Sequence, residues 1–205
     1  GPFPLAQPSD IPFYEFAFGS GVDVVSQTPT AVVVRNAETG ALTTVHGTGM
    51  SVNMTTGSIT GTATGWTTRN AAGTEVMTAQ NISWSLGAFA AAIDALEDRG
   101  DVRPVLALLS LQPITVNAAG AVVPIRALMP EGITSAITFT GSAFRDDFRG
   151  SNGNDIVNVG TVPRDQQSNI QGSGGNDRID FGAVTPQSGT NAIFYGALPV
   201  TGIAV

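Results

Sequence analysis

The sequence predicts a mainly β protein, with an N-terminal antiparallel β domain that carries one or two short helices and a short parallel β-roll after it. The composition is typical of a folded, turn-rich chain, because 42% of the residues are hydrophobic, 12% are charged and 25 are glycine. Short runs rich in Thr and Val alternate with turn signals through the first half, and segments rich in Gly and Asp recur near the C-terminus. We therefore divide the chain into a β-rich capping domain, residues 1–136, and a roll with its C-terminal strand or strands, residues 137–205.

The first part of the capping domain is predicted to consist of short strands. Turn signals such as Glu38-Thr39-Gly40 and Thr56-Gly57 separate runs of β-branched residues, which indicates antiparallel hairpins in a curled sheet or a sandwich. The predicted strands cover residues 13–18, 22–25, 30–35, 41–46, 49–54, 58–64, 65–69 and 75–84.

Two helices are expected to follow these strands. Apolar residues from Leu86 to Leu96 have helical spacing, and Gly100 stands where a helix would end, so we predict an amphipathic helix near residues 86–99. Pro104 suits a first helical turn, which indicates a short second helix within residues 102–111. Strand-like runs at 114–117 and 121–126 come next, and residues 137–140 are expected to begin the first rung of the roll.

Three segments near the C-terminus share a nine-residue pattern. GSNGNDIVN at 150–158 and GSGGNDRID at 172–180 each have Gly at positions one and four, Ser at two, Asp at six and an apolar residue at eight. GSAFRDDFR at 141–149 keeps the first Gly, the Asp and the apolar residue, but Phe144 replaces the second Gly. Gly permits a tight loop, and Asp supplies oxygen ligands of the kind that calcium prefers. Alternatively, these stretches are ordinary hairpin turns.

The repeats resemble the calcium-binding nonapeptides of the RTX, or hemolysin-type, family, whose pattern is G-G-x-G-x-D-x-U-x with U a large apolar residue. The resemblance implies a β-roll in which each repeat makes a loop and a short strand, and two repeats complete a coil. It also implies Ca2+ as the cofactor, and secretion by a type I route with a C-terminal export signal. Both complete segments depart from the family pattern at position two, where they carry Ser.

The spacing of the apolar residues at position eight predicts how the half-coils stack. These residues lie nine, thirteen and nine positions apart, at Phe148, Val157, Ile170 and Ile179. If half-coils alternate between two sides of the roll, Asp155 and Asp177 lie on the same side in successive coils and face one calcium ion. On the other side Asp146 would pair with Ser168, which predicts a weaker site.

The resemblance also implies carbonyl ligands for the calcium ion that Asp155 and Asp177 would share. Carried over by position, they are Gly150, Asn152, Ser173 and Gly175. With the two carboxylates they complete the predicted metal site.

Charge and composition exclude several classes of protein. All basic residues are Arg, and the net charge of -7 argues against a nucleic-acid partner. The absence of Cys excludes a disulfide framework and thiolate chemistry, and it favours a secreted or cell-surface location for a chain that must cross a channel unfolded. No apolar run is long enough to predict a membrane span.

No catalytic residue is predicted, and we expect the chain not to be an enzyme. His46 is the sole histidine and stands in a strand-like segment, which leaves no serine triad and no HExxH zinc motif. Trp66 and Trp84 could stack on a glycan, although packing in the core is the simpler interpretation.

The sequence therefore predicts a secreted structural or adhesive surface protein whose roll is ordered by extracellular Ca2+. The alternative is an ancillary domain, for targeting or glycan binding, of a secreted enzyme or effector. The apolar segment 191–205 could add to the roll, stack on another subunit or carry the export signal. Stacking would allow self-assembly into a filament or layer.

Overall fold

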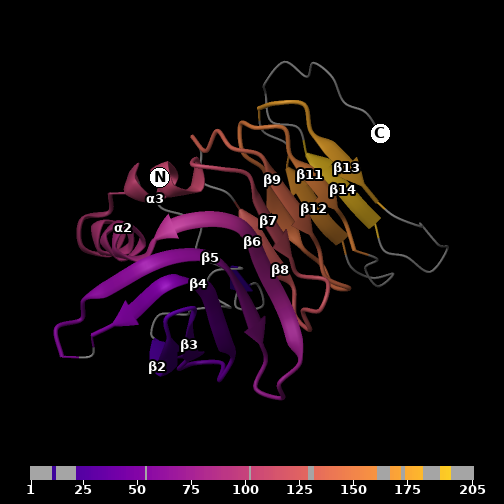
Figure 1. The fold of residues 1–205 in the computed structure, drawn as a ribbon. Coiled ribbons are helices and arrows are strands. Elements are labelled where there is room, and N and C mark those ends of the chain that lie inside the picture. The colour runs from indigo at the N-terminus through magenta and orange to yellow at the C-terminus, as the bar shows by residue number, and fades with distance from the viewer. Residues whose placement is uncertain are drawn as a thin grey trace.

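The computed structural model describes residues 11–12, 22–53, 55–101, 103–128, 132–160, 167–171, 174–181 and 190–194. This part of the chain is mainly β with two helices, and it contains both antiparallel and parallel sheet, which confirms the predicted fold class. Figure 1 shows the antiparallel strands at one end of the molecule and the parallel strands at the other. The predicted strand at 13–18 lies outside the described residues.

One sheet of nine strands runs through both ends of the molecule. Its order is β13-β11-β9-β7-β6-β5-β4-β3-β2. The strands that come first in the sequence form antiparallel pairs with their neighbours. They are β2 (Val22–Thr28), β3 (Ala31–Asn36), β4 (Leu42–Val52), β5 (Ile59–Arg69) and β6 (Glu75–Ser85).

The helices α2 (Leu86–Arg99) and α3 (Arg103–Leu109) follow β6 directly, as predicted. The hydroxyl of Ser85 accepts a hydrogen bond from the N–H of Ala88 at 3.3 Å, and Gly100 adopts a φ of 63° just after the helix. These are ordinary signals for the start and end of a helix. α2 packs on β5 and β6. Among the described residues, no helix is long and apolar enough to cross a membrane.

Two predicted strand breaks are wrong, because β4 and β5 are each continuous where two strands were expected. The pairing register shifts at His46/Gly47 and at Ala63/Gly65, which marks β-bulges. A Cβ on Gly47 would overlap the carbonyl oxygen of Thr62. Glycine is therefore needed there for close approach of two strands and does not mark a turn.

The rest of the chain alternates between two sheets. β7 (Ile114–Asn117), β9 (Ile137–Thr140), β11 (Ile156–Asn158) and β13 (Arg178–Asp180) extend the nine-stranded sheet. The second sheet has the order β1-β8-β10-β12-β14, from β1 (Ile11–Pro12), β8 (Ile125–Leu128), β10 (Asp147–Arg149), β12 (Gln167–Gln171) and β14 (Thr190–Phe194). Neighbours within the second sheet, and from β7 to β13 in the first, are parallel. The chain thus winds into a parallel roll.

The register of the roll confirms the predicted stacking of alternate half-coils. Phe148 pairs with Ile170 in one sheet, and Val157 pairs with Ile179 in the other. β14 pairs with β12, so residues 190–194 add a strand to the roll, while 195–205 lie outside the described residues.

The parallel part begins earlier than expected. β7 pairs in parallel with β9, and β8 with β10, so residues 114–128 already form part of a coil. The second strand of this coil covers 125–128, not 121–126, and it lies in the other sheet from β7.

One hydrophobic core extends from the antiparallel end into the roll. Trp66 and Trp84 lie within it beneath α2, with Trp84 stacked on Phe89 at 6.0 Å between ring centroids. Phe139 and Phe148 face each other from the two sheets of the roll, with ring centroids 5.3 Å apart. The inward residue of each short strand therefore fills the space between the two sheets.

Candidate functional site

The candidate site lies in the turns that precede β10, β11 and β13, where the three repeats fall. In the first two turns the Ser at position two and the Asp at position six are buried. They are Ser142 with Asp146, and Ser151 with Asp155. In the third turn Asp177 is half-buried, and Ser173 lies outside the described residues.

The carboxylate of Asp155 is surrounded by hydrogen-bond donors. Its Oδ1 accepts from the backbone N–H of Ile137 at 2.7 Å and from the hydroxyl of Ser151 at 2.8 Å. Its Oδ2 accepts from the backbone N–H of Ser151 at 2.7 Å. Asp155 thus closes its own turn through Ser151 and also binds the preceding coil through Ile137.

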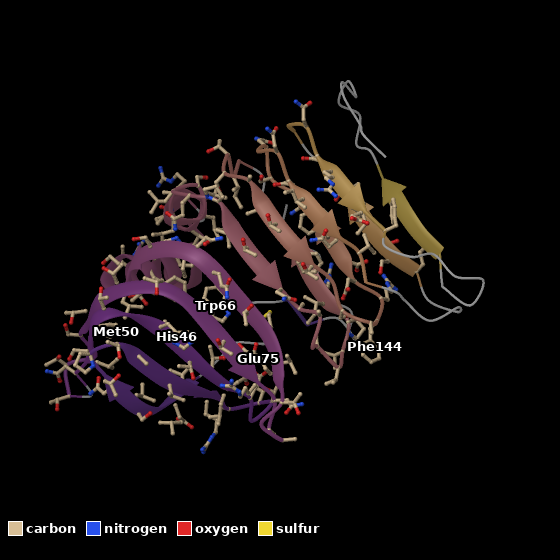
Figure 2. The ribbon with its side chains drawn as sticks, turned by 45° about the vertical axis from the view of Figure 1, so that its right-hand side comes forward. His46, Met50, Trp66, Glu75 and Phe144 are labelled. Atoms are coloured by element: carbon tan, nitrogen blue, oxygen red, sulfur yellow. The ribbon has the colours of Figure 1, made fainter. Side chains whose placement is uncertain are left out.

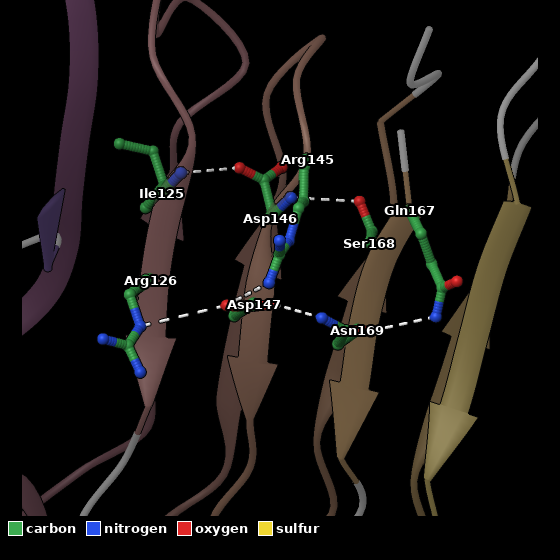
Figure 3. Close-up of polar contacts among 8 residues, drawn as sticks. All are labelled: Ile125, Arg126, Arg145, Asp146, Asp147, Gln167, Ser168 and Asn169. Atoms are coloured by element: carbon green, nitrogen blue, oxygen red, sulfur yellow. Dashed lines mark hydrogen bonds and ion pairs between the residues drawn. The ribbon is translucent and has the colours of Figure 1, made fainter. Parts of the chain in front are cut away.

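The carboxylate of Asp146 repeats this arrangement on the other side of the roll. Its Oδ1 accepts from the N–H of Ile125 at 2.9 Å and from the hydroxyl of Ser142 at 2.8 Å, and its Oδ2 accepts from the N–H of Ser142 at 2.6 Å. Figure 3 shows the bond to Ile125, which crosses to the neighbouring strand. The two turns therefore share one design.

Each of these aspartates also donates its own backbone N–H to the next coil. The N–H of Asp155 donates to Oδ1 of Asp177 at 3.0 Å, so the predicted stacking of these two residues is confirmed. The N–H of Asp146 donates to the hydroxyl of Ser168 at 3.1 Å, which confirms the predicted register of that pair (Figure 3). The side chains of Asp177 and Ser168 thus each accept a hydrogen bond from the backbone of the preceding coil.

The serine at position two has a second bond in the turn. The hydroxyl oxygen of Ser142 accepts from the N–H of Phe144, and that of Ser151 from the N–H of Gly153, both at 3.0 Å. The hydroxyl of Ser151 also lies 2.6 Å from the carbonyl oxygen of Ser135, so its single hydrogen serves either that oxygen or Asp155. The serine joins the aspartate to the backbone of the loop.

A second polar row runs along the outside of the five-stranded sheet (Figure 3). Asp147 lies between Arg126 and Asn169, with an ion pair of 3.9 Å to Nε of Arg126 and a hydrogen bond of 2.6 Å from Nδ2 of Asn169. Gln167 in turn donates to Asn169 at 3.1 Å. Because these residues occupy paired positions of neighbouring strands, the row supports the same register as the turns.

Burial and hydrogen bonding act in opposite directions on the buried carboxyl groups. Burial raises the pKa of Asp146 to about 6, although the hydrogen bonds from Ile125 and Ser142 lower it. Burial also raises the pKa of Asp155, and the nearby negative charge of Asp177 adds to this increase. The donors therefore offset the cost of burying each charge only in part.

The hydrogen-bond partners of these carboxylates determine whether the turns can hold calcium. A calcium ion needs roughly six to eight oxygen ligands with free lone pairs. The oxygens of Asp146 and Asp155 instead face N–H and O–H groups, whose hydrogens would repel a cation. In the part of the chain that the structure describes, no group of three or more His, Cys, Asp or Glu residues could hold a metal ion. The first two turns do not fit calcium in this arrangement.

The predicted carbonyl ligands are spread over the turns. Gly150 is buried, and its N–H donates to the carbonyl of Gln171 at 3.2 Å. Asn152 is exposed, and its N–H donates to the carbonyl of Ile133 at 2.8 Å. Gly175 is exposed with a φ of 92°, which favours glycine. Calcium binding at the turn of Asp177 stays a prediction.

Sequence reasoning missed the role of the serines and of the first coil. Ser151 was seen as a departure from the repeat pattern and Ser142 was not singled out, yet both contact the aspartate of their own turn. The signal was available, because Ser follows the first Gly in all three segments. The backbone N–H groups of Ile125 and Ile137 were not considered as hydrogen-bond donors to the aspartates.

The other candidates of the sequence analysis lie in the antiparallel end (Figure 2). His46 is an exposed residue of β4, and its Nε2 lies 3.2 Å from the hydroxyl oxygen of Thr67. Trp66 and Trp84 are 6% and 5% exposed, so they pack in the core as expected and are closed to a glycan.

Comparison with known proteins gives no match to a family model, a curated protein or a solved structure.

Proposed function

We propose that this chain is a structural module of a secreted or cell-surface protein, in which an antiparallel sheet begins and stabilises a parallel β-roll. The observation that carries this proposal is the position of β7. It pairs antiparallel with β6 on one side and parallel with β9 on the other, within one sheet. Through β7, the antiparallel strands set the register of the coils that follow.

A cap of this kind answers a physical need of a parallel roll. The first strands of a roll would otherwise expose a row of unpaired N–H and C=O groups, which invites aggregation. Here β6 pairs with β7, the first strand of the roll in the nine-stranded sheet, and residues 11–12 pair with β8, the first strand of the roll in the other sheet. Both sheets of the roll are therefore paired at their N-terminal edge.

The remaining parts of the functional hypothesis rest on the sequence. The acidic, Cys-free composition and the RTX-like repeats support secretion. Calcium binding is proposed for the turn of the third repeat, which holds the half-buried Asp177. The proposal also includes adhesion, and self-assembly through the apolar segment 191–205. Protease treatment of intact producing cells should remove the chain if it is exposed on the cell surface. A chain that survives this treatment inside the cells would contradict the proposed location.

Urea unfolding followed by two probes tests the role of the cap. Both tryptophans of the chain lie in the antiparallel end, so tryptophan fluorescence reports on the cap alone. Amide hydrogen exchange in β10 and β11 reports on the roll. The two transitions should share one midpoint, because a shared sheet and core couple the two parts. A roll that stays protected after the cap has unfolded would contradict the proposal.

A further inference from the structure

We infer that the turns of Asp146 and Asp155 fold without a metal ion, because the serine of each turn and the backbone of the preceding coil take the place of a cation. This goes beyond the proposed structural function and departs from the calcium chemistry that the repeat pattern implies. It concerns the turns of the first two repeats, residues 141–146 and 150–155.

The number of donors supports this inference first. An ionised carboxylate has roughly four acceptor positions. Two backbone N–H groups occupy those of Asp155 at 2.7 Å, and the Ser151 hydroxyl, whose hydrogen also has the carbonyl of Ser135 within reach, lies at 2.8 Å. Three donors occupy those of Asp146 at 2.6 to 2.9 Å. Each of the two aspartates is 1% exposed, so solvent has little access to it. Charge-assisted hydrogen bonds of this length are the strong ones, and they leave little for an ion to coordinate.

The position of Ser168 supports it independently. Ser168 stands one coil after Asp146 at the paired position, as Asp177 does for Asp155. Each accepts the backbone N–H of the earlier aspartate, at 3.1 Å for Ser168 and 3.0 Å for Asp177. A metal site would lose much of its affinity when a neutral hydroxyl replaces a carboxylate. A hydrogen-bonded turn needs only an acceptor, and either side chain supplies one.

The close contact of successive turns points the same way. A Cβ on Gly153 would lie 2.6 Å from the backbone nitrogen of Ala136, and one on Gly174 would lie 3.3 Å from the Cα of Asn152. The loops of neighbouring coils therefore touch through their backbones at these glycines. In this arrangement glycine serves the packing of loop on loop, which is a role separate from metal binding.

The serine is the part of the turn that the sequence specifies for this purpose. Two of the three donors to each aspartate are backbone N–H groups, which almost any sequence offers. The third is the hydroxyl of Ser142 or Ser151. Removing this hydroxyl weakens a turn held by hydrogen bonds, whereas Gly at the same position would restore the calcium-binding pattern of the RTX resemblance.

Amide hydrogen exchange on the full chain, in EGTA and in millimolar calcium, tests the inference. The amides to follow are those that donate to the two carboxylates, at Ile125, Ile137, Ser142 and Ser151. They should be protected in EGTA, and calcium should change their exchange rates by less than about threefold. Protection that appears only with calcium would overturn the inference and leave the capping role of the antiparallel sheet intact.

Two matched variants sharpen the test. In EGTA, Ser151→Ala should speed exchange at Ile137 about tenfold and leave Ile125 unchanged, and Ser142→Ala should do the reverse. Each variant is thus the control for the other, since the two serines serve opposite sides of the roll. If Ser151→Gly left the amide of Ile137 as protected in EGTA as in the wild type, the serine would have no such role and the inference would fail.

Discussion

The antiparallel end and the parallel roll are stabilised in different ways although they share a sheet. β4, β5 and β6 have 11 residues each, so every pairing forms a long ladder of backbone hydrogen bonds. β10, β11 and β13 have 3 residues each. So short a strand offers few ladder bonds, and the buried aspartates and serines of the turns add bonds between coils. The comparison teaches that in the roll the turns carry part of the work that strand length does elsewhere.

The two regions also fill their cores differently. At the antiparallel end, large side chains from two strands and a helix meet, namely Trp66 of β5, Trp84 of β6 and Phe89 of α2. In the roll a short strand contributes only one or two inward residues, such as Phe148 of β10 or Ile137 and Phe139 of β9. A truncation inside the roll should therefore leave a space that few neighbours on the same strand can fill.

The largest effect is expected from Phe139→Ala, which removes one of two stacked rings at the centre of the roll. We expect the free energy of unfolding to fall by about 3–5 kcal/mol, from lost burial and the cavity left behind. Urea denaturation measures the change. Ile156→Ala, at an outward position of the next strand, is the control and should cost less than about 1 kcal/mol. Equal losses for both variants would contradict this account of the core.

A smaller effect is expected from pH, through Asp146. Its pKa is about 6 in the folded protein against an ordinary 3.8, so the folded state holds the proton more tightly than the unfolded chain. Its stabilising contribution is present below about pH 4 and is lost as pH rises through 6, by roughly 2–3 kcal/mol. The measurement compares wild type with Asp146→Asn by urea denaturation at pH 4 and pH 7. The stability difference between the two proteins should shift by this amount in favour of the variant at pH 7. A difference that does not change with pH would show that the carboxyl titrates normally.

The smallest effect is expected in the antiparallel end, from Arg69→Gln. Arg69 and Glu75 form an ion pair of 3.1 Å across β5 and β6, with both side chains about half exposed. Solvent screens such a pair, so its loss should cost less than about 1 kcal/mol. Thermal unfolding in low and high salt measures it, because salt should remove the difference between variant and wild type. A loss as large as that of Phe139→Ala would mean that surface pairs, and not long ladders, stabilise the cap.

Much of the fold could be predicted because its signals are local. The helix at 86–99 has apolar residues at helical spacing and Gly100 at its end, and the structure gives the same bounds. The register of Val157 with Ile179 followed from counting residues between repeats. The two strand breaks were wrong because glycine serves both turns and close contacts, and Gly47 belongs to the second kind.

The first coil could not be found from the repeat because it does not contain the repeat. At the positions of Asp146 and Asp155, the earlier strands have Ile125 and Ile137. β7 is the first strand of the roll in its sheet, and its neighbour on the other side is the antiparallel strand β6. No earlier coil therefore has an N–H group that needs an acceptor side chain on β7. The N–H of Ile114 is satisfied instead by the carbonyl of Ala136 at 3.1 Å. Aspartate is thus absent at position 137, where the backbone N–H group beside it, that of Ile114, already has a carbonyl acceptor.

The positions of the aspartates relative to the next coil were predicted correctly, but the groups that their carboxylates contact were not. Counting residues put Asp155 next to Asp177 and Asp146 next to Ser168, as the structure has them. A repeat pattern does not show which atoms a carboxylate faces. That depends on the backbone N–H groups of Ile125 and Ile137, which leave no trace in residue type.

Four of the bonds between the coils point the same way along the chain. The side chains of Asp146, Asp155, Ser168 and Asp177 each accept from the coil before, at an offset of 18 to 22 residues. A new coil inserted by duplication of such a unit would satisfy the amide ahead of it and present its own amide to the next. The length of the roll is therefore free to vary in evolution, since neither the cap nor the last coil has to change when the number of coils does.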